Sequence, residues 1–482
     1  MKKLIFALLA VTAAETLTAT TALDAMTNDV TVVMTSLSAK QRYPWNGKVD
    51  IDFTFTSTIP EAYAFINFKA EYVNAAGETV EVPMKTFDQF ETAFATNAGT
   101  YRVTWDSTAD APGLTVTNLK YTVTANMAKY MVIDLSKGTA ATAEDPYPIK
   151  YYEDVPDFEG VEKGKWDDYH KTTNLVLRLI QPGKFTQAWS DSNCNREGLA
   201  HTAILTKPYY IAVFEMTQEQ SFLLNGTYGM NNVFTGGRRK LRPTQISYIN
   251  VRGSTLSGVV NWPITGSKVA SSSMLNLIRT KTGTQGFDLP TECEWEFACR
   301  SGGRASGFWN DGSDAGIPTS TKFNTVQNGD AALERLGRYQ HNGGMVKTEN
   351  EGVYTYKEAD KASDESLGTA VVGSYEPNFW GLYDMHGNVA EWCNGVWPST
   401  WATWLDKEGY YCHGKYPLTD DVGPAIKTWT SSQYRIARGG NWNSPAQNCL
   451  SPRRGNVNHA LFTEGQQAGI RLCWRFPSAA QE

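Results

Sequence analysis

Apolar residues occupy every second position from Val49 to Phe55, and Asp or Thr fills the positions between them. This period of two predicts a half-buried β-strand, and Asn46-Gly47 just before it predicts a tight turn. The same alternation recurs three more times, at residues 66–72, 101–105 and 119–123. Five or six short strands within about 100 residues predict an all-β, immunoglobulin-like sandwich over residues 28–130. The sandwich holds no His, Cys or paired acids, so we expect a role in spacing or adhesion.

The first residues favour export. Lys2 and Lys3 precede a short apolar run, Leu4 to Val11, which is typical of a secretory signal peptide, here residues 1–25. A buried N-terminal helix is the alternative. The run is too short to span a bilayer, and no later segment is apolar for long enough. We therefore expect an exported protein, in the periplasm, at the cell surface or secreted, that does not span a membrane.

Charge and length narrow the function classes. A chain of 482 residues is long enough for two or three domains. Its net charge is −6, and the longest basic run is Arg238-Arg239-Lys240, so the sequence argues against a nucleic-acid partner. The seven Cys are an odd number, which leaves at least one thiol unpaired even in an oxidising compartment. No Cys-x-x-Cys pair occurs, so a zinc ribbon is not supported.

The remainder divides into a connection and a second domain. Residues 131–171 are rich in Gly, Pro, Asp and Glu and have little periodicity, which predicts a linker. Residues 172–478 alternate short strands, two modest helices and long loops full of Gly, Asn, Ser and Trp. This pattern predicts an α+β domain with low regular secondary structure.

Four motifs of the second domain form one set. Thr217 with Gln220, and Thr291 with Glu294, predict capping boxes at the start of two helices. The four motifs, in chain order, are Tyr209–Gln220, Phe287–Arg300, Gly381–Trp392, and Arg438–Trp442 followed by Gly469–Leu472. Together they resemble the formylglycine-generating enzyme (sulfatase-modifying factor) family. The resemblance implies a C-type-lectin-like fold variant that is stabilised by bound calcium.

The resemblance also implies where calcium binds. On the loop of the third motif, Asn388 and Glu391 would supply side-chain oxygens, and Gly387 and Val389 would supply backbone carbonyls. Hard oxygen ligands suit calcium. The alternative is that Asn388 caps a helix and Glu391 reaches back to the cap.

Only one of the two catalytic cysteines that the resemblance implies is present in this chain. The family's oxidases carry two cysteines, five residues apart, that bind copper through sulfur. The matching positions here are Ser444 and Cys449, and a serine hydroxyl cannot replace a thiolate ligand. The sequence therefore argues against copper. Cys449 is left as a disulfide partner or a residual catalytic residue, and the resemblance implies a bridge from Cys299 to Cys449 or Cys473.

Several aromatic residues are candidate ligand-binding residues, because aromatic faces stack on sugars and other flat ligands. These candidates, together with one His of a late loop, are Trp397, Trp401, Trp404, Trp442 and His459. The alternative is that they fill gaps in a loop-rich core, which the motif position favours for Trp442. We predict a catalytically degenerate binding module for a glycan or an exported protein. The alternative function is a copper-dependent oxidase that converts a sulfatase cysteine to formylglycine.

Overall fold

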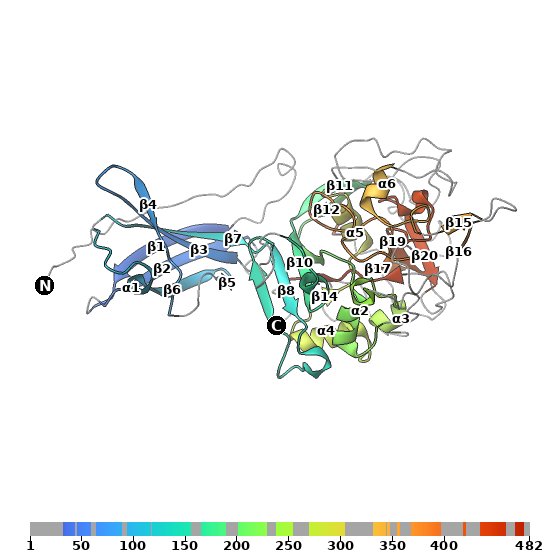
Figure 1. The fold of residues 1–482 in the computed structure, drawn as a ribbon, viewed down its shortest axis with the longest axis horizontal. Coiled ribbons are helices and arrows are strands. Elements are labelled where there is room, and N and C mark those ends of the chain that lie inside the picture. The colour runs from blue at the N-terminus through green and yellow to red at the C-terminus, as the bar shows by residue number, and fades with distance from the viewer. Residues whose placement is uncertain are drawn as a thin grey trace. The chain divides into compact units, whose positions relative to one another are not determined.

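The computed structural model divides into two compact units, Asp29–Met131 with Lys150–Phe158, and Val132–Ile149 with Glu159–Glu482 (Figure 1). We consider each unit by itself. The structure describes residues 32–43, 46–58, 64–88, 94–116, 118–155, 165–188, 201–228, 238–253, 269–303, 331–343, 345–347, 354–356, 368–396, 418–420, 434–458 and 468–476. The expected signal peptide, residues 1–25, lies outside these ranges.

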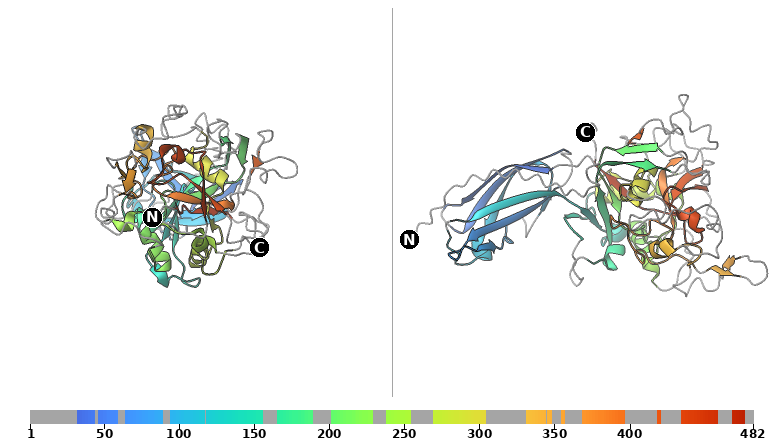
Figure 2. Two further views of the ribbon diagram at one scale, coloured as in Figure 1. Left: turned by 90° about the vertical axis from the view of Figure 1, so that its right-hand side faces the viewer. Right: turned by 90° about the horizontal axis from the view of Figure 1, so that it is seen from above.

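The N-terminal unit contains two small antiparallel sheets (Figure 2). One has the order β1-β2-β6, and in the other β3 pairs with β4, β5 and β7. The strands are β1 (Val32–Gln41), β2 (Lys48–Ser57), β3 (Ala64–Val73), β4 (Thr79–Val82), β5 (Phe94–Thr96), β6 (Gly99–Asp106) and β7 (Lys120–Met127). The apolar positions of β2, Val49 to Phe55, are all buried and pack around Trp105. The alternation of residues 49–56 is thus confirmed as a strand, while the immunoglobulin-like topology stays a prediction.

The largest sheet among the described residues has six strands. Its order is β14 (Phe287–Asp288), β22 (Cys473–Arg475), β13 (Tyr209–Ala212), β10 (Asn174–Ile180), β8 (Tyr130–Asp134) and β9 (Ile149–Tyr152). The prediction of a linker over residues 131–171 is wrong at β8 and β9. Residues Tyr130 to Ile133 are buried without alternation, because this strand is covered on both faces and shows no period of two.

The rest of the C-terminal unit consists of short elements joined by loops. Three smaller sheets comprise β11 (Gly183–Gln187), β12 (His201–Leu205) and β18 (Leu418–Thr419); β15 (Met345–Lys347) and β16 (Tyr354–Tyr356); and β20 (Arg454–Asn458), β19 (Tyr434–Arg438), β17 (Ala390–Val396) and β21 (Ala468–Gly469). The α-helices are α1 (Ser107–Asp110) of the N-terminal unit, and α2 (Gln218–Asn225), α3 (Tyr248–Arg252), α4 (Met274–Thr282), α5 (Glu292–Cys299) and α6 (Ala331–Leu336). The 3-10 turns are η2 (Gly138–Ala140), η3 (Tyr169–Lys171), η4 (Arg239–Leu241) and η8 (Ala446–Cys449). The predicted α+β class with low regular secondary structure is confirmed.

Both predicted capping boxes are present. The Thr217 hydroxyl accepts a hydrogen bond from the Gln220 amide at 3.3 Å, and the Gln220 side chain accepts from the Thr217 amide at 2.9 Å. Thr291 and Glu294 do the same at the start of α5, at 3.2 and 2.8 Å. These caps satisfy backbone donors that a short helix leaves open. No described helix is long and apolar enough to cross a membrane.

Candidate functional site

The three glutamates of α5 are structural. Each of their carboxylates forms an ion pair with an arginine. Arg438 binds Glu292 at 2.9 Å and Glu296 at 2.7 Å, and Arg475 binds Glu294. All three carboxylates are at most slightly exposed. Buried charges of opposite sign must be paired in this way to remain charged in the interior. The acids of this motif therefore tie α5 to strands β19 and β22 and are not available as general acids.

The glutamate of the third motif, Glu391, is held by another arginine, Arg471. The Arg471 guanidinium donates to both oxygens of Glu391, at 2.6 to 2.9 Å, and Trp295 Nε1 donates to the same carboxylate at 2.6 Å. The remaining Arg471 hydrogens go to the carbonyls of Ala212, Val213 and Tyr383, at 2.7 to 3.0 Å. Arg471 and Glu391 are almost completely buried. The pair joins β13, β17 and the loop of the third motif at one point.

Asn388 is also engaged inside the protein. Its amide nitrogen donates to Glu215 at 2.6 Å, and its side-chain oxygen accepts from the Ala370 amide at 2.8 Å. Its φ of 60° is left-handed, which Asn tolerates better than most residues. The alternative that Asn388 caps a helix is wrong, because Glu391 lies in strand β17 and not in a helix.

Asp384 fits a cation better than Asn388 does. Its Oδ2 accepts from the Gly373 amide at 2.6 Å, while its buried Oδ1 has no hydrogen-bond partner in the part of the chain that the structure describes. Burial raises the pKa of the Asp384 carboxyl to about 6. Among the described residues, no cluster of three or more His, Cys, Asp or Glu could hold a metal, so backbone carbonyls would have to complete such a site. Sequence reasoning missed Asp384, although it stands in the third motif.

A buried histidine separates two cysteines near the Gly439-Gly440 turn. His386 Nδ1 lies 2.7 Å from the Cys449 carbonyl, and Nε2 lies 3.7 Å from Cys299 Sγ. Because a carbonyl only accepts, Nδ1 carries the hydrogen and the Cys299 thiol donates to Nε2. Burial lowers the pKa of His386 to about 4, so the ring is neutral at pH 7. The contact is a neutral thiol-imidazole pair and not an activated thiolate.

The expected disulfide from Cys299 is not formed. Cys299, Cys449 and Cys473 all carry free thiols, as do Cys293 and Cys393. The imidazole of His386 contacts the Cys299 sulfur through Nε2 and the Cys449 backbone carbonyl through Nδ1. Cys194 and Cys412 lie outside the described residues.

The Ser444 hydroxyl forms its hydrogen bonds within its own turn. Its hydroxyl accepts from the Asn441 amide at 3.0 Å and donates to the Asn441 side-chain oxygen at 3.1 Å. Cys449 Sγ lies 3.9 Å from the Pro445 carbonyl and packs in an apolar cluster with Leu333, Leu336 and Tyr339, which raises the pKa of its thiol. A methyl group on Gly440 would lie 2.6 Å from Cys449 Sγ, which explains the glycine there. This loop therefore offers one protonated thiol and one hydroxyl.

The candidate aromatic residues divide into two groups. Trp442 is only 2% exposed, so it belongs to the core and presents no surface to a ligand. Trp397, Trp401, Trp404 and His459 lie outside the described residues.

We expect the thiols of Cys299 and Cys449 to be unreactive in the native protein. Both are buried, and burial raises both thiol pKa values, so little of the nucleophilic thiolate forms at pH 8. Iodoacetamide should label neither residue in native protein and both in urea without reductant, as measured by peptide mass spectrometry. Labelling in urea that required prior reduction would show that the two residues are bridged after all.

Comparison with known proteins places the second and larger unit in a family. The model of the sulfatase-modifying factor enzyme 1-like domain matches residues 167–476. The formylglycine-generating enzyme of Thermomonospora curvata is 32% identical over 131 residues, which cover 26% of this chain and 34% of the enzyme. The matched part therefore spans about a third of that enzyme's length.

Two further proteins are similar to this chain over a larger share of their own length. The chaperone protein LppX of Paenibacillus barcinonensis is 23% identical over 286 residues, 56% of this chain and 80% of LppX. Among solved structures, Treponema denticola variable protein 1 is similar at a TM-score of 0.40 and 21% identity, over 63% of this chain and 95% of that protein.

Proposed function

Because this chain belongs to the sulfatase-modifying factor enzyme 1-like domain family, we propose that it is an exported, catalytically degenerate member that binds a ligand instead of oxidising a cysteine. The observation that carries the proposal is the hydroxyl of Ser444 at the first of the two cysteine positions that the family's oxidases use. That hydroxyl is already bonded on both sides within its own turn.

Soft-metal chemistry is poorly supported at this loop. Cu(I) favours thiolate ligands, and a neutral hydroxyl is a hard, weak ligand for it. The remaining thiol, Cys449, is buried in an apolar cluster that disfavours its thiolate. Both ring nitrogens of His386 are engaged, one by the Cys449 carbonyl and the other by the Cys299 thiol, so neither is available to a metal ion.

Calcium is a second part of the proposal. Of the four ligands that the resemblance implied, Asn388 has both ends of its amide engaged, and both oxygens of Glu391 accept from Arg471. The proposal therefore keeps the carbonyls of Gly387 and Val389 as ligands. The orphaned Oδ1 of Asp384 supplies the missing carboxylate oxygen. Bound calcium would order this loop by collecting hard oxygens.

The ligand that we propose is a protein surface or a glycan. The long match to a relative described as a chaperone protein favours a protein surface, because it covers 80% of that relative. The unassigned Trp397, Trp401, Trp404 and His459 favour a stacking surface for a glycan. A C-type-lectin-like fold for the second unit and an immunoglobulin-like fold for the first are part of the same proposal.

The copper oxidase remains the second candidate, because Cys449 is retained at one catalytic position. The test is aerobic turnover of a sulfatase-derived cysteine peptide with added copper, together with a glycan and protein array probed with and without a calcium chelator. We expect no aldehyde in the peptide and chelator-sensitive retention on the array. Aldehyde formation that Cys449→Ser abolishes would overturn the proposal.

A further inference from the structure

Three short segments of the second unit meet at the first turn of α2. The Thr217 hydroxyl donates to the Lys171 carbonyl of η3 at 2.6 Å, and Arg239 of η4 donates to the Gln218 side chain at 3.0 Å. These contacts bring η3 and η4 to the same end of one helix. The surface that results uses none of the residues around Ser444 and Cys449.

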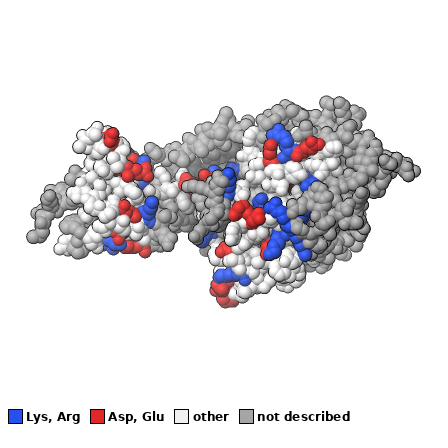
Figure 3. Space-filling model, viewed as in Figure 1, with Lys and Arg blue, Asp and Glu red and all other residues white. Residues whose placement is uncertain are grey.

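Cations are concentrated on this surface. The basic run Arg238-Arg239-Lys240 forms the start of η4, and the side chains of Arg238 and Lys240 are 50% and 63% exposed. Arg238 lies 3.5 Å from Asp168, and Lys240 lies 2.9 Å from Glu219. The Arg238–Asp168 pair is exposed on both sides, so water and salt screen it and an incoming anion can exchange with Asp168 at little cost. In the second pair Lys240 is exposed while Glu219 is mostly buried. Figure 3 shows Lys and Arg atoms gathered on this part of the unit.

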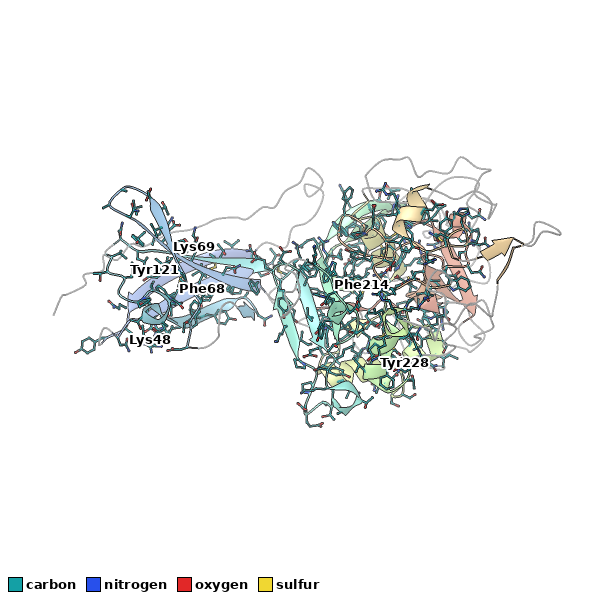
Figure 4. The ribbon with its side chains drawn as sticks, viewed as in Figure 1. Lys48, Phe68, Lys69, Tyr121, Phe214 and Tyr228 are labelled. Carbon is teal, nitrogen blue, oxygen red and sulfur yellow. The ribbon has the colours of Figure 1, made fainter. Side chains whose placement is uncertain are left out.

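An aromatic stack lies directly beside these cations. The rings of Phe222 and Tyr228 stack with centroids 4.5 Å apart at 16°, and the Arg239 guanidinium lies 4.1 Å from the Tyr228 centroid. Tyr228 is labelled in Figure 4. Two groups cannot share one ring face at such distances, so Tyr228 is held between them. One face of the Phe222 ring is therefore held against Tyr228, and Phe222 is 38% exposed. Glu219 and Phe222 are three residues apart on α2 and share a face, and Glu219 holds the Lys240 ammonium at 2.9 Å.

The backbone conformation at Arg238 is unusual. Its φ of 52° is left-handed, a strained conformation for a residue other than glycine. The Arg238 side chain is half exposed, so the strained backbone does not serve to bury this side chain. Strain at an exposed position is typical of residues that are held for binding.

We propose that this surface, formed by Phe222, Tyr228, Arg238 and Lys240, binds an acidic polysaccharide. A pyranose ring packs its apolar face on Phe222, and the carboxylates of neighbouring sugars pair with Arg238 and Lys240. An acidic polypeptide would satisfy the cations but would leave the rigid ring face without a matching flat group. The assignment rests on the proposed ligand-binding function and names a ligand class and a surface for it.

The experiment titrates the full chain with hyaluronate, a soluble uronate polymer, and with neutral dextran, by isothermal calorimetry at several NaCl concentrations. We expect salt-sensitive binding of hyaluronate and none of dextran. Phe222→Ala and the double substitution Arg238→Ala/Lys240→Ala should each weaken hyaluronate binding at least tenfold. Arg335→Ala and Phe379→Ala remove an equally exposed cation and aromatic ring elsewhere and should leave affinity unchanged.

Three outcomes would overturn the assignment. The first is that wild-type protein does not bind hyaluronate. The second is that the control substitutions weaken binding as much as the surface substitutions. The third is that polyglutamate binds equally well and independently of Phe222. In the first two cases, ligand retention on the calcium-dependent array would leave the proposed function standing. In the third, the surface is a docking site for an acidic polypeptide.

Discussion

Replacing Arg471 by alanine should destabilise the second unit by about 3–5 kcal/mol, because it leaves the Glu391 carboxylate buried without its cation. The same substitution removes the donors to the carbonyls of Ala212, Val213 and Tyr383. Each buried acceptor that loses its partner adds a desolvation cost. Urea unfolding followed by tryptophan fluorescence measures the loss, and hydrogen exchange in β13, β17 and β22 locates it in this unit.

Two further variants separate charge from packing. Arg335→Ala breaks the exposed pair with Glu376 and should cost less than about 1 kcal/mol. The double substitution Arg471→Met/Glu391→Leu removes both buried charges and should recover much of the loss, since paired charges are costly to desolvate. A single Arg471→Ala variant as stable as wild type would mean that the pair is not buried in solution.

The arginine pairs give the second and fourth family motifs a structural role in this chain. Glu292, Glu294 and Glu296 stand in the second motif, and their partners Arg438 and Arg475 stand in or just after the fourth. The two motifs are therefore two halves of one buried ionic framework. This framework serves the fold and its stability, and it includes neither Ser444 nor Cys449.

Local patterns in the sequence predicted local structure well. The alternation of residues 49–56 identified β2, and Thr-x-x-Gln and Thr-x-x-Glu identified the starts of α2 and α5. Strand β8 was missed because a strand buried on both faces has no period that distinguishes it from a connection. The surrounding Gly, Pro and acidic residues then dominated the composition of residues 131–171.

Long-range partners could not be predicted in this way. Glu391 and Arg471 are 80 residues apart, so nothing in either motif alone indicates that the glutamate is neutralised by arginine. Cys299 lies at the end of α5, and its neighbour is the imidazole of His386 instead of a second sulfur. Asp384 became a candidate only through the structure, in which its Oδ1 has no hydrogen-bond partner among the described residues, since the family resemblance had indicated Asn388.

Replacing Ser444 by cysteine should create a soft-metal site in this loop. A second sulfur at this position would stand in the turn that leads directly to Cys449, whose Sγ already lies 3.9 Å from the Pro445 carbonyl. Two thiolates hold Cu(I) far better than one thiol and a hydroxyl. We expect affinity for Cu(I) to rise at least about tenfold, which corresponds to about 1.4 kcal/mol. Competition with a chromogenic Cu(I) chelator under anaerobic, reducing conditions measures the change.

The controls decide whether sulfur is the cause. Ser444→Ala removes the hydroxyl and its bonds to Asn441 without adding a ligand, so it should bind Cu(I) no better than the native chain. Ser444→Cys/Cys449→Ser keeps one thiol and should lose the gain. Since burial disfavours the Cys449 thiolate, the gain should also grow as pH rises, when less work is needed to remove the thiol proton. If native protein instead bound Cu(I) as tightly as Ser444→Cys, and Cys449→Ser abolished that binding, the serine would not be the reason for a loss of oxidase chemistry, and the degenerate-enzyme proposal would fail with it.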